Sequence, residues 1–343
     1  YWYWHNGYAR PLAPDDFPKA LEIKDSTGQS ILIKHKDVED YHRTLGVHLN
    51  LLGQMDGEYA FLKKKSDKYA ALTQSSVFSR QETDTAYWTS YLPSIGYSAS
   101  ITTFTPRQCH FIEAKAIRAY LQHSGYPGNF PRAMVNGPQK YGGKGYRPIS
   151  TEQGLEKILK VVSHVRQQSE LGCQIRILVE TSQLLAGTSA PLWVSTQQSL
   201  PHCASSAPWV LCIRSFLHKI QGSIHMSSYY VPPAQRTRDV ALMDIILDIC
   251  KSPATLERFT QVRMYLQVFW LSDILNGSGL AIRRAFYDNP PSDLATPRTT
   301  LRWPRQGRPG PAAFQTWRSL FKKAFLETGS KSLMVLHRYR QGS

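Results

Sequence analysis

Apolar residues are spaced differently in the first fifty residues than in the rest of the chain. The early part shows short apolar clusters between turn residues, as at residues 21–23 and 30–33, which flank Ser26-Thr27-Gly28. A turn of this composition between two apolar runs favours a β-hairpin. Residues 1–4 and 43–49 fit two further strands. The pattern therefore predicts a small β-rich region at the start of the chain.

Beyond residue 57 the apolar positions recur three and four residues apart, which is the period of an α-helix. The spacing predicts helices over residues 58–76, 79–92, 105–124, 151–168, 208–221, 236–251, 254–275 and 312–327. Residues 173–181 fit either a continued helix or a strand, because Ile175, Ile177 and Val179 are β-branched. Taken together, the pattern predicts an α+β fold that is predominantly α, in which helical bundles follow the β region.

The composition indicates a packed, intracellular protein. Hydrophobic residues make up 42% of the 343 residues, which is enough for a core. We expect no membrane span, because no apolar run reaches about eighteen residues. The five cysteines are scattered, without a CxxC pair, which favours reduced thiols in the cytoplasm, the nucleus or both. The start Tyr-Trp-Tyr-Trp, without an initiator Met, suggests a piece of a longer protein.

Positive charge is concentrated at the C-terminal end. The net charge is +16, and residues 283–343 hold 12 Lys/Arg against 3 Asp/Glu. A tail this basic suits a polyanion such as nucleic acid. A solvated tail that only improves solubility fits the charge equally well.

A glycine-rich loop lies between two predicted helices. Residues 131–150 read PRAMVNGPQKYGGKGYRPIS, and the residues that define the loop are Pro131, Arg132, Gly137, Pro138, Gly142, Gly143 and Gly145. Glycines mark positions of positive φ or close backbone approach, so we expect a shaped loop. The spacing fits neither GxGxxG nor GxxxxGK[ST]. A turn that packs the loop on a helix is therefore favoured over a phosphate cradle.

This loop resembles the "P…GGLG" segment that follows the thumb helices in reverse transcriptases of non-LTR-type retrotransposons, and more closely that of related polyproteins from unicellular eukaryotes. Three other segments resemble the same proteins in the same order. Tyr41-His42-Arg43-Thr44-Leu45-Gly46-Val47 is similar to a "K-x-LGV" strand beyond the polymerase palm. Residues 263–277, beginning RMYLQV, resemble a downstream helix, and residues 301–317, beginning LRWPRQ, resemble the segment after it.

The resemblance implies a post-palm region of a reverse transcriptase polyprotein, with the palm upstream of residue 1. It divides the chain into a β-rich post-palm region (1–53), a thumb-like helical region (54–130), the Gly-rich loop and helix (131–185), a linker (186–207), a helical connection (208–287), and a basic Pro/Arg arm with a terminal helix (288–343). The implied partners are RNA and DNA as template–primer, and the upstream palm and fingers.

The carboxylates do not form a polymerase centre. Phosphoryl transfer needs carboxylates that hold two metal ions, usually on a Tyr-x-Asp-Asp hairpin, and the chain has none. Asp15-Asp16 is the only Asp pair and falls in a predicted loop. Asp239, Asp244 and Asp248, with the distant Glu180, fit solvated positions better than a nuclease cluster. We therefore expect no catalytic residue, no metal site and no cofactor in this chain, with Mg²⁺ bound only at the absent palm.

Two basic groups are the candidate nucleic-acid contacts. Arg298, Arg302, Arg305 and Arg308 surround Trp303 in the C-terminal arm; guanidinium groups grip phosphate, and an indole gives a base a stacking face. Trp303-Pro304 fits equally well as a contact that docks the arm on the helical body. The second group is Lys63, Lys64, Lys65 and Lys68 on the helix at 58–76, for which a merely solvated face is the alternative.

Two other functions fit the sequence. The 8 Trp and 18 Tyr, with the helix at 254–275, fit a protein–protein interaction module of a retroelement polyprotein. A degenerate element remnant without activity fits the absence of catalytic residues as well.

Overall fold

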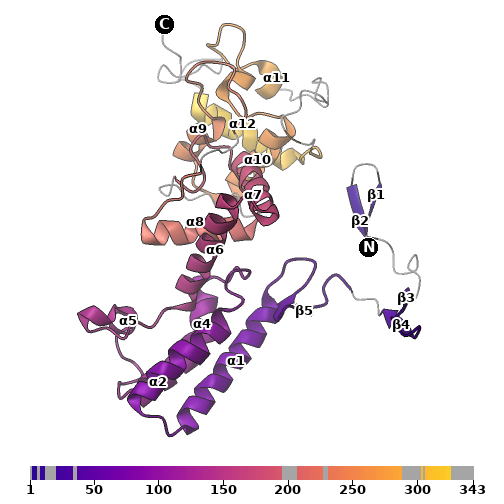
Figure 1. The fold of residues 1–343 in the computed structure, drawn as a ribbon. Coiled ribbons are helices and arrows are strands. Elements are labelled where there is room, and N and C mark those ends of the chain that lie inside the picture. The colour runs from indigo at the N-terminus through magenta and orange to yellow at the C-terminus, as the bar shows by residue number, and fades with distance from the viewer. Residues whose placement is uncertain are drawn as a thin grey trace. The chain divides into compact units, whose positions relative to one another are not determined.

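The computed structural model describes residues 2–5, 8–11, 21–33, 37–194, 207–226, 231–287, 303 and 306–325. It divides the chain into two compact units (Figure 1): residues 1–83 with 111–128, and residues 84–110 with 129–343. The long helix α4 (Pro106–His123) contributes to both units. The fold is predominantly α with a small N-terminal β region, as expected.

The strands of the first unit form three separate antiparallel hairpins. They are β1 (Trp2–His5) with β2 (Tyr8–Pro11), β3 (Leu21–Lys24) with β4 (Ser30–Ile33), and β5 (His42–Thr44) with β6 (Val47–Leu49). The second hairpin confirms the turn predicted at residues 26–28. The Asp25 carboxylate accepts hydrogen bonds from the Thr27 N–H and hydroxyl and from the Gln29 N–H.

The single strand expected at residues 43–49 is wrong. The chain reverses at Leu45 and Gly46, which have φ angles of 48° and 89°. Two central residues with positive φ make the two-residue turn that matches the twist of a hairpin. The apolar run hid this turn because leucine is an unusual residue for it.

The helices of the first unit follow the predicted pattern. Helix α1 (Asp56–Ser75) buries Glu58, Leu62, Ser66, Ala70 and Thr73, which lie on one side of the helix because they are spaced by three or four residues. β6 and the first-unit part of α4 contact α1. Gly125, which has a φ of 82°, follows α4. A glycine with positive φ is a common residue just beyond a helix, and its position agrees with the end predicted at residue 124.

The second unit is helical. A continuous run begins with α2 (Arg80–Ala86), whose residues up to Thr83 belong to the first unit, and goes on through a π-helical turn (Tyr87–Tyr91) to α3 (Leu92–Gly96). The later helices are α5 (Arg132–Asn136), α6 (Ile149–Arg166), α7 (Glu170–Ala186), α8 (Pro208–Ile220), α9 (Leu242–Ile249), α10 (Pro253–Tyr265), α11 (Arg284–Tyr287) and α12 (Pro311–Phe325). No described helix is both long and apolar enough to cross a membrane.

Three expectations for the second unit need correction. The helix expected at 236–251 begins only at Leu242, and Ala241 before it forms a β-bridge with Trp270. Residues 173–181 belong to α7, a helix whose first turn is capped by the Ser169 hydroxyl accepting from the Gly172 N–H, so the strand alternative is wrong. The helix expected at 254–275 ends at Tyr265. Gln267 has a φ of 59°, and the Asp273 carboxylate then accepts from the N–H groups of Phe269 and Trp270.

Aromatic packing holds α10 and α12 together in the main core. The Phe259 ring stacks on Trp317, with centroids 4.5 Å apart, and meets Phe321 edge-on. Trp317 donates its indole N–H to the Phe286 carbonyl, which ties α11 to the same core. The 254–275 segment is therefore mostly internal and offers little surface for packing with another chain.

Candidate nucleic-acid interface

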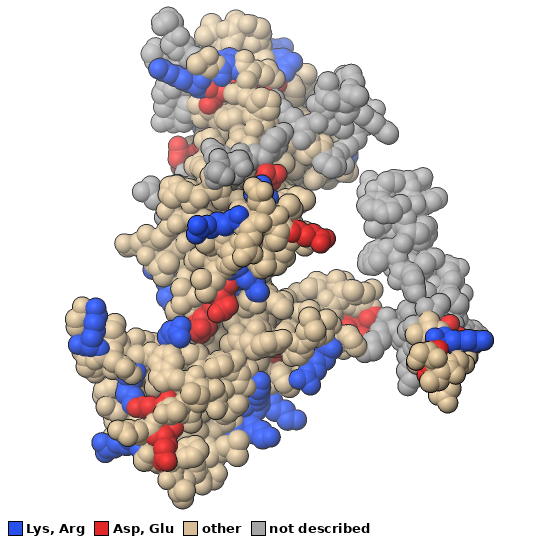
Figure 2. All heavy atoms as spheres, viewed as in Figure 1, with Lys and Arg blue, Asp and Glu red and all other residues tan. Residues whose placement is uncertain are grey.

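The lysines of α1 lie away from its packed side. Lys63, Lys64 and Lys68 are exposed, and Lys65 is half-buried. Lys64 and Lys68 are two and six residues beyond the buried Leu62, which at 100° per residue places them on the opposite side of the helix. Lys63 is on one flank and Lys65 on the other. We call Lys63, Lys64 and Lys68 the α1 lysine face; Figure 2 shows basic side chains along this helix.

Two of the three acidic residues of α1 have partners outside the lysine face, and the third, Asp56, is exposed at the first residue of the helix. Asp67 lies beside the lysine face, and its carboxylate is 3.2 Å from the ammonium of Lys115 on α4. Glu58 is buried, and its carboxylate accepts from the backbone N–H of His48 at 2.8 Å and contacts the His48 ring nitrogen Nδ1 at 3.0 Å. Within the described residues, no ion pair involves the α1 lysine face.

A residue that the sequence did not single out as a contact extends the basic surface. Arg43 on β5 is exposed, and its guanidinium carbon lies 5.8 Å from the centre of the Phe61 ring. The Lys65 ammonium lies 5.9 Å from the same ring. Burial lowers the pKa of Lys65, the Glu58 charge opposes this, and the nearby Arg43 adds to the lowering. Arg43 is twenty-two residues from Lys65 in sequence, so only the docking of the β5–β6 hairpin on α1 could reveal the pair.

The C-terminal arm is only partly described. Arg298, Arg302 and Arg305 lie outside the described residues. Arg308 is exposed, with its guanidinium carbon 5.4 Å from the centre of the Phe314 ring.

Trp303 is not available as a stacking face. It is 5% exposed, and its indole N–H donates to the Met264 carbonyl at 2.8 Å. The Gln267 side chain bonds both the backbone N–H and the carbonyl of Trp303. The structure therefore shows the docking contact that the sequence left open, and the expected role of Trp303 in base stacking is wrong for this conformation.

The glycine-rich loop is shaped by close backbone approach. Gly142 and Gly145 have φ angles of 82° and 73°. A Cβ on Gly143 would lie 2.1 Å from the Gly137 carbonyl oxygen. Every backbone N–H from Gly142 to Tyr146 donates to a carbonyl of the same loop, over 2.8 to 3.2 Å. Since a phosphate cradle needs free N–H groups, this loop is a packing device.

The end of the loop docks on the α2 segment and the π-helical turn. The Asp84 carboxylate is 2.6 Å from the Lys144 ammonium and accepts from the Tyr146 hydroxyl at 2.6 Å. The Tyr146 ring stacks on Tyr87 with centroids 3.9 Å apart, and the Tyr87 hydroxyl donates to the Arg147 carbonyl. Pro131 and Arg132 lie at the start of α5 and are exposed.

The carboxylates form no cluster among the described residues. Asp244 is partly buried and accepts from the Ser189 hydroxyl at 2.6 Å and from its N–H at 3.2 Å; burial raises its pKa. The solvated position expected for Asp244 is therefore wrong. Asp239 is 3.6 Å from Arg236 and its side chain is fully buried, so the solvated position expected for it is wrong as well. In the part of the chain that the structure describes, no three His, Cys, Asp or Glu side chains could hold a metal. Asp15 and Asp16 lie outside it.

No family model, no curated protein and no solved structure matches this chain.

Proposed function

We propose that this chain is a non-catalytic, nucleic-acid-binding part of a retroelement reverse transcriptase. In this proposal the α1 lysine face contacts the phosphate backbone of template–primer, and a palm elsewhere performs phosphoryl transfer. The observation that carries the binding role is the lysine face itself, since three exposed ammonium groups on one helix suit a regularly spaced polyanion. Arg43 adds a cation from the β5–β6 hairpin.

The link to a reverse transcriptase rests on the four segments that resemble that family in order. Neither the lysines nor the charge would identify the polymerase on their own. Because the contacts proposed are to phosphates, binding should follow charge and duplex shape rather than base sequence.

The binding role is tested by replacing Lys63, Lys64 and Lys68 with Gln and measuring affinity for a labelled RNA–DNA duplex by fluorescence anisotropy at several salt concentrations. Each lost phosphate contact removes about 0.7 to 0.9 from the slope of log K against log salt. The triple variant should therefore bind more weakly, with a slope smaller by about 2 to 3.

A matched control separates these contacts from net charge. Lys24, Lys140 and Lys322 are exposed and lie outside α1, so their replacement with Gln removes the same total charge. We expect the salt slope of this control to differ from the wild-type slope by no more than the effect of one phosphate contact, which is about 0.7 to 0.9. Equal losses in the two triple variants would show that the charge acts diffusely, and an unchanged α1 variant would refute the interface.

The resemblance is tested separately by the reading frame upstream of residue 1. An Asp-Asp hairpin flanked by apolar strands is expected there. A frame without one would leave the nucleic-acid-binding role standing and remove the polymerase from the proposal.

A further inference from the structure

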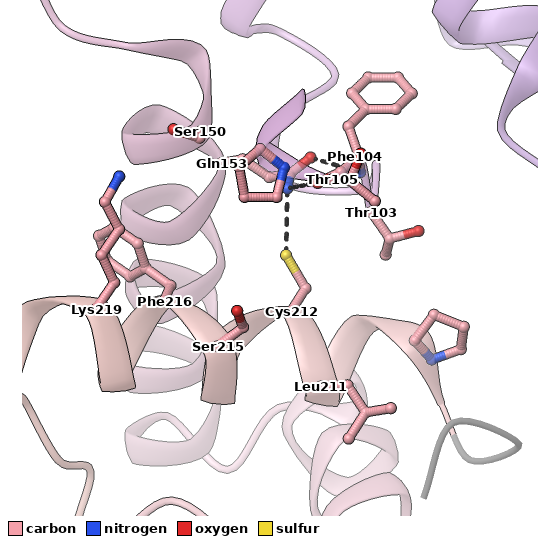
Figure 3. A pocket seen from close by; sticks show the side chains of 12 residues that line it. Thr103, Phe104, Thr105, Ser150, Gln153, Leu211, Cys212, Ser215, Phe216 and Lys219 are labelled. Carbon is pink, nitrogen blue, oxygen red and sulfur yellow. Dashed lines mark hydrogen bonds between the residues drawn. The ribbon is translucent and has the colours of Figure 1, made fainter. Parts of the chain in front are cut away.

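A cavity of about 300 Å³ lies in the second unit between the segment that enters α4, the start of α6 and one side of α8. Figure 3 shows its lining. Its residues are Thr103, Phe104, Thr105, Pro106, Ser150, Gln153, Pro208, Leu211, Cys212, Ser215, Phe216 and Lys219. The six from α8 recur at three- and four-residue intervals, so they form one stripe of that helix. This volume is at the lower end of the range for small-molecule sites.

The wall beside α8 depends on a glycine. A Cβ on Gly154 of α6 would lie 2.1 Å from the Phe216 ring. The ring therefore packs directly on the α6 backbone, where any larger residue would displace it. With Phe104, which is 4% exposed, Phe216 gives the cavity an apolar body.

Two buried side chains of α6 fix the opposite wall. The Gln153 amide donates to the Phe104 carbonyl at 2.9 Å and accepts from the Phe104 N–H at 3.0 Å. It also approaches the Cys212 sulfur at 3.2 Å. One turn further, the fully buried Lys157 ammonium donates to the carbonyls of Ala99 and Thr102. These bonds hold the segment before α4 in place, so the cavity is formed before any ligand arrives.

The only charged residue among the described lining residues is Lys219. It is exposed and lies at the same end of the cavity as Ser150 (Figure 3). None of the described lining residues is a carboxylate, so the charge of the cavity complements an anion and not a cation. The combination of an apolar body with one cation at the end defines the chemistry of the occupant.

We propose that this cavity binds a small amphipathic acid, with its alkyl or aromatic body between Phe104, Cys212 and Phe216 and its anionic group at Lys219. The proposal is independent of nucleic-acid binding, because it uses none of the α1 residues. Cys212 on the lining gives a built-in probe of occupancy. It is a free thiol that is half-buried, whereas Cys173 on α7 is free and exposed and does not line the cavity.

The experiment alkylates the full chain with neutral N-ethylmaleimide and follows Cys212 and Cys173 by peptide mass spectrometry. Decanoate is the probe ligand. At about five times its Kd, an occluding ligand fills five-sixths of the sites and should slow Cys212 alkylation about sixfold. Cys173 in the same sample should react at an unchanged rate. Decylammonium, which has the same chain and the opposite charge, should not protect Cys212.

Two variants test the two parts of the site. Lys219→Glu should raise the Kd for decanoate about fivefold or more, since it replaces an attractive charge with a repulsive one. Ser215→Trp, at an exposed lining position, should fill the space and abolish protection. Lys322→Glu on α12 is the control and should bind decanoate as the wild type does. Equal protection by decylammonium, or unchanged protection in both cavity variants, would overturn the proposal.

Discussion

At Gly143 the backbone passes the Gly137 carbonyl with no room for a side chain, since a Cβ would come within 2.1 Å of its oxygen. We predict that Gly143→Ala lowers the free energy of unfolding by about 2 kcal/mol, because the loop backbone has to move. Gly96→Ala is the control. Its Cβ would meet nothing within 4 Å, and alanine should stabilise the helix by about 0.5 kcal/mol. Urea denaturation measures both, and equal effects would contradict the close approach.

The buried Lys157 predicts a pH dependence of stability. Desolvation lowers its pKa from 10.5 to about 8, while the nearby thiols of Cys212 and Cys109 oppose the shift. Between these two values the unfolded chain binds more protons than the folded one, so the free energy of unfolding should rise with pH. The expected rise from pH 8 to 10 is on the order of 2 kcal/mol. The neutral amine still has two N–H groups for its two carbonyl partners.

Lys157→Met isolates this contribution from other groups that titrate in the same range. The variant lacks the amine, so its stability should not show the rise, and the difference between wild type and variant should grow from pH 8 to 10. Denaturant titrations at each pH measure it. A difference that stays constant would mean that the folded and unfolded chains release this proton at the same pH.

Trp303 shows what sequence alone could not decide at the scale of one residue. An indole between arginines is equally compatible with stacking on a base and with docking on the protein. Which of the two occurs depends on partners far away in sequence. The Met264 carbonyl accepts from the indole N–H, and the guanidinium carbon of the buried Arg263 is 5.9 Å from the centre of the indole ring. The α1 lysine face was easier to predict, because helical spacing alone sets which residues face outward.

Among the elements, the β5–β6 hairpin has an unusual turn. Leu45 is 87% exposed and has positive φ, a conformation that costs a leucine more than an asparagine. We predict that Leu45→Asn stabilises the hairpin by about 0.5 to 1 kcal/mol. Hydrogen exchange of the β5 and β6 amides should slow about two- to fivefold. Leu51→Asn, at a 77% exposed position whose φ is not positive, should leave these rates unchanged.

The helix predictions are correct where one side of the helix is packed and the other is exposed to solvent, because only then does the sequence have a helical period. α1, α4, α8 and α12 are of this kind. The prediction failed after Tyr265, where Leu266, Val268 and most residues to Leu275 are buried. A segment that is buried on all sides shows no helical period in its sequence. The end of α10 is set instead by Gln267, with its positive φ, and by the Asp273 carboxylate. For α7, helical packing in the core outweighed the β-branched residues.

For the whole molecule, the distribution of charge matters more than its total of +16. Charges that do not reach a phosphate contribute little at physiological salt, since the Debye length is about 8 Å. More than half of the excess falls in residues 283–343. In the described structure, it is the lysine face of the first unit that has a defined geometry. Whether one nucleic-acid molecule contacts both regions is a property of the full chain and can be measured.

We predict that both regions contact the same duplex. Replacing Arg302, Arg305 and Arg308 with Ala should reduce the salt slope by up to about 2 to 3, as should the α1 triple variant, and combining them should subtract both amounts. Additive slopes with a single 1:1 binding step require simultaneous contacts. If the arm binds a duplex independently of α1, the α1 triple variant should keep a second and weaker binding step. The salt slope of that step should be the slope of the arm alone. Fluorescence anisotropy and sedimentation with one short duplex distinguish the two, because only separate binding allows two duplexes per chain.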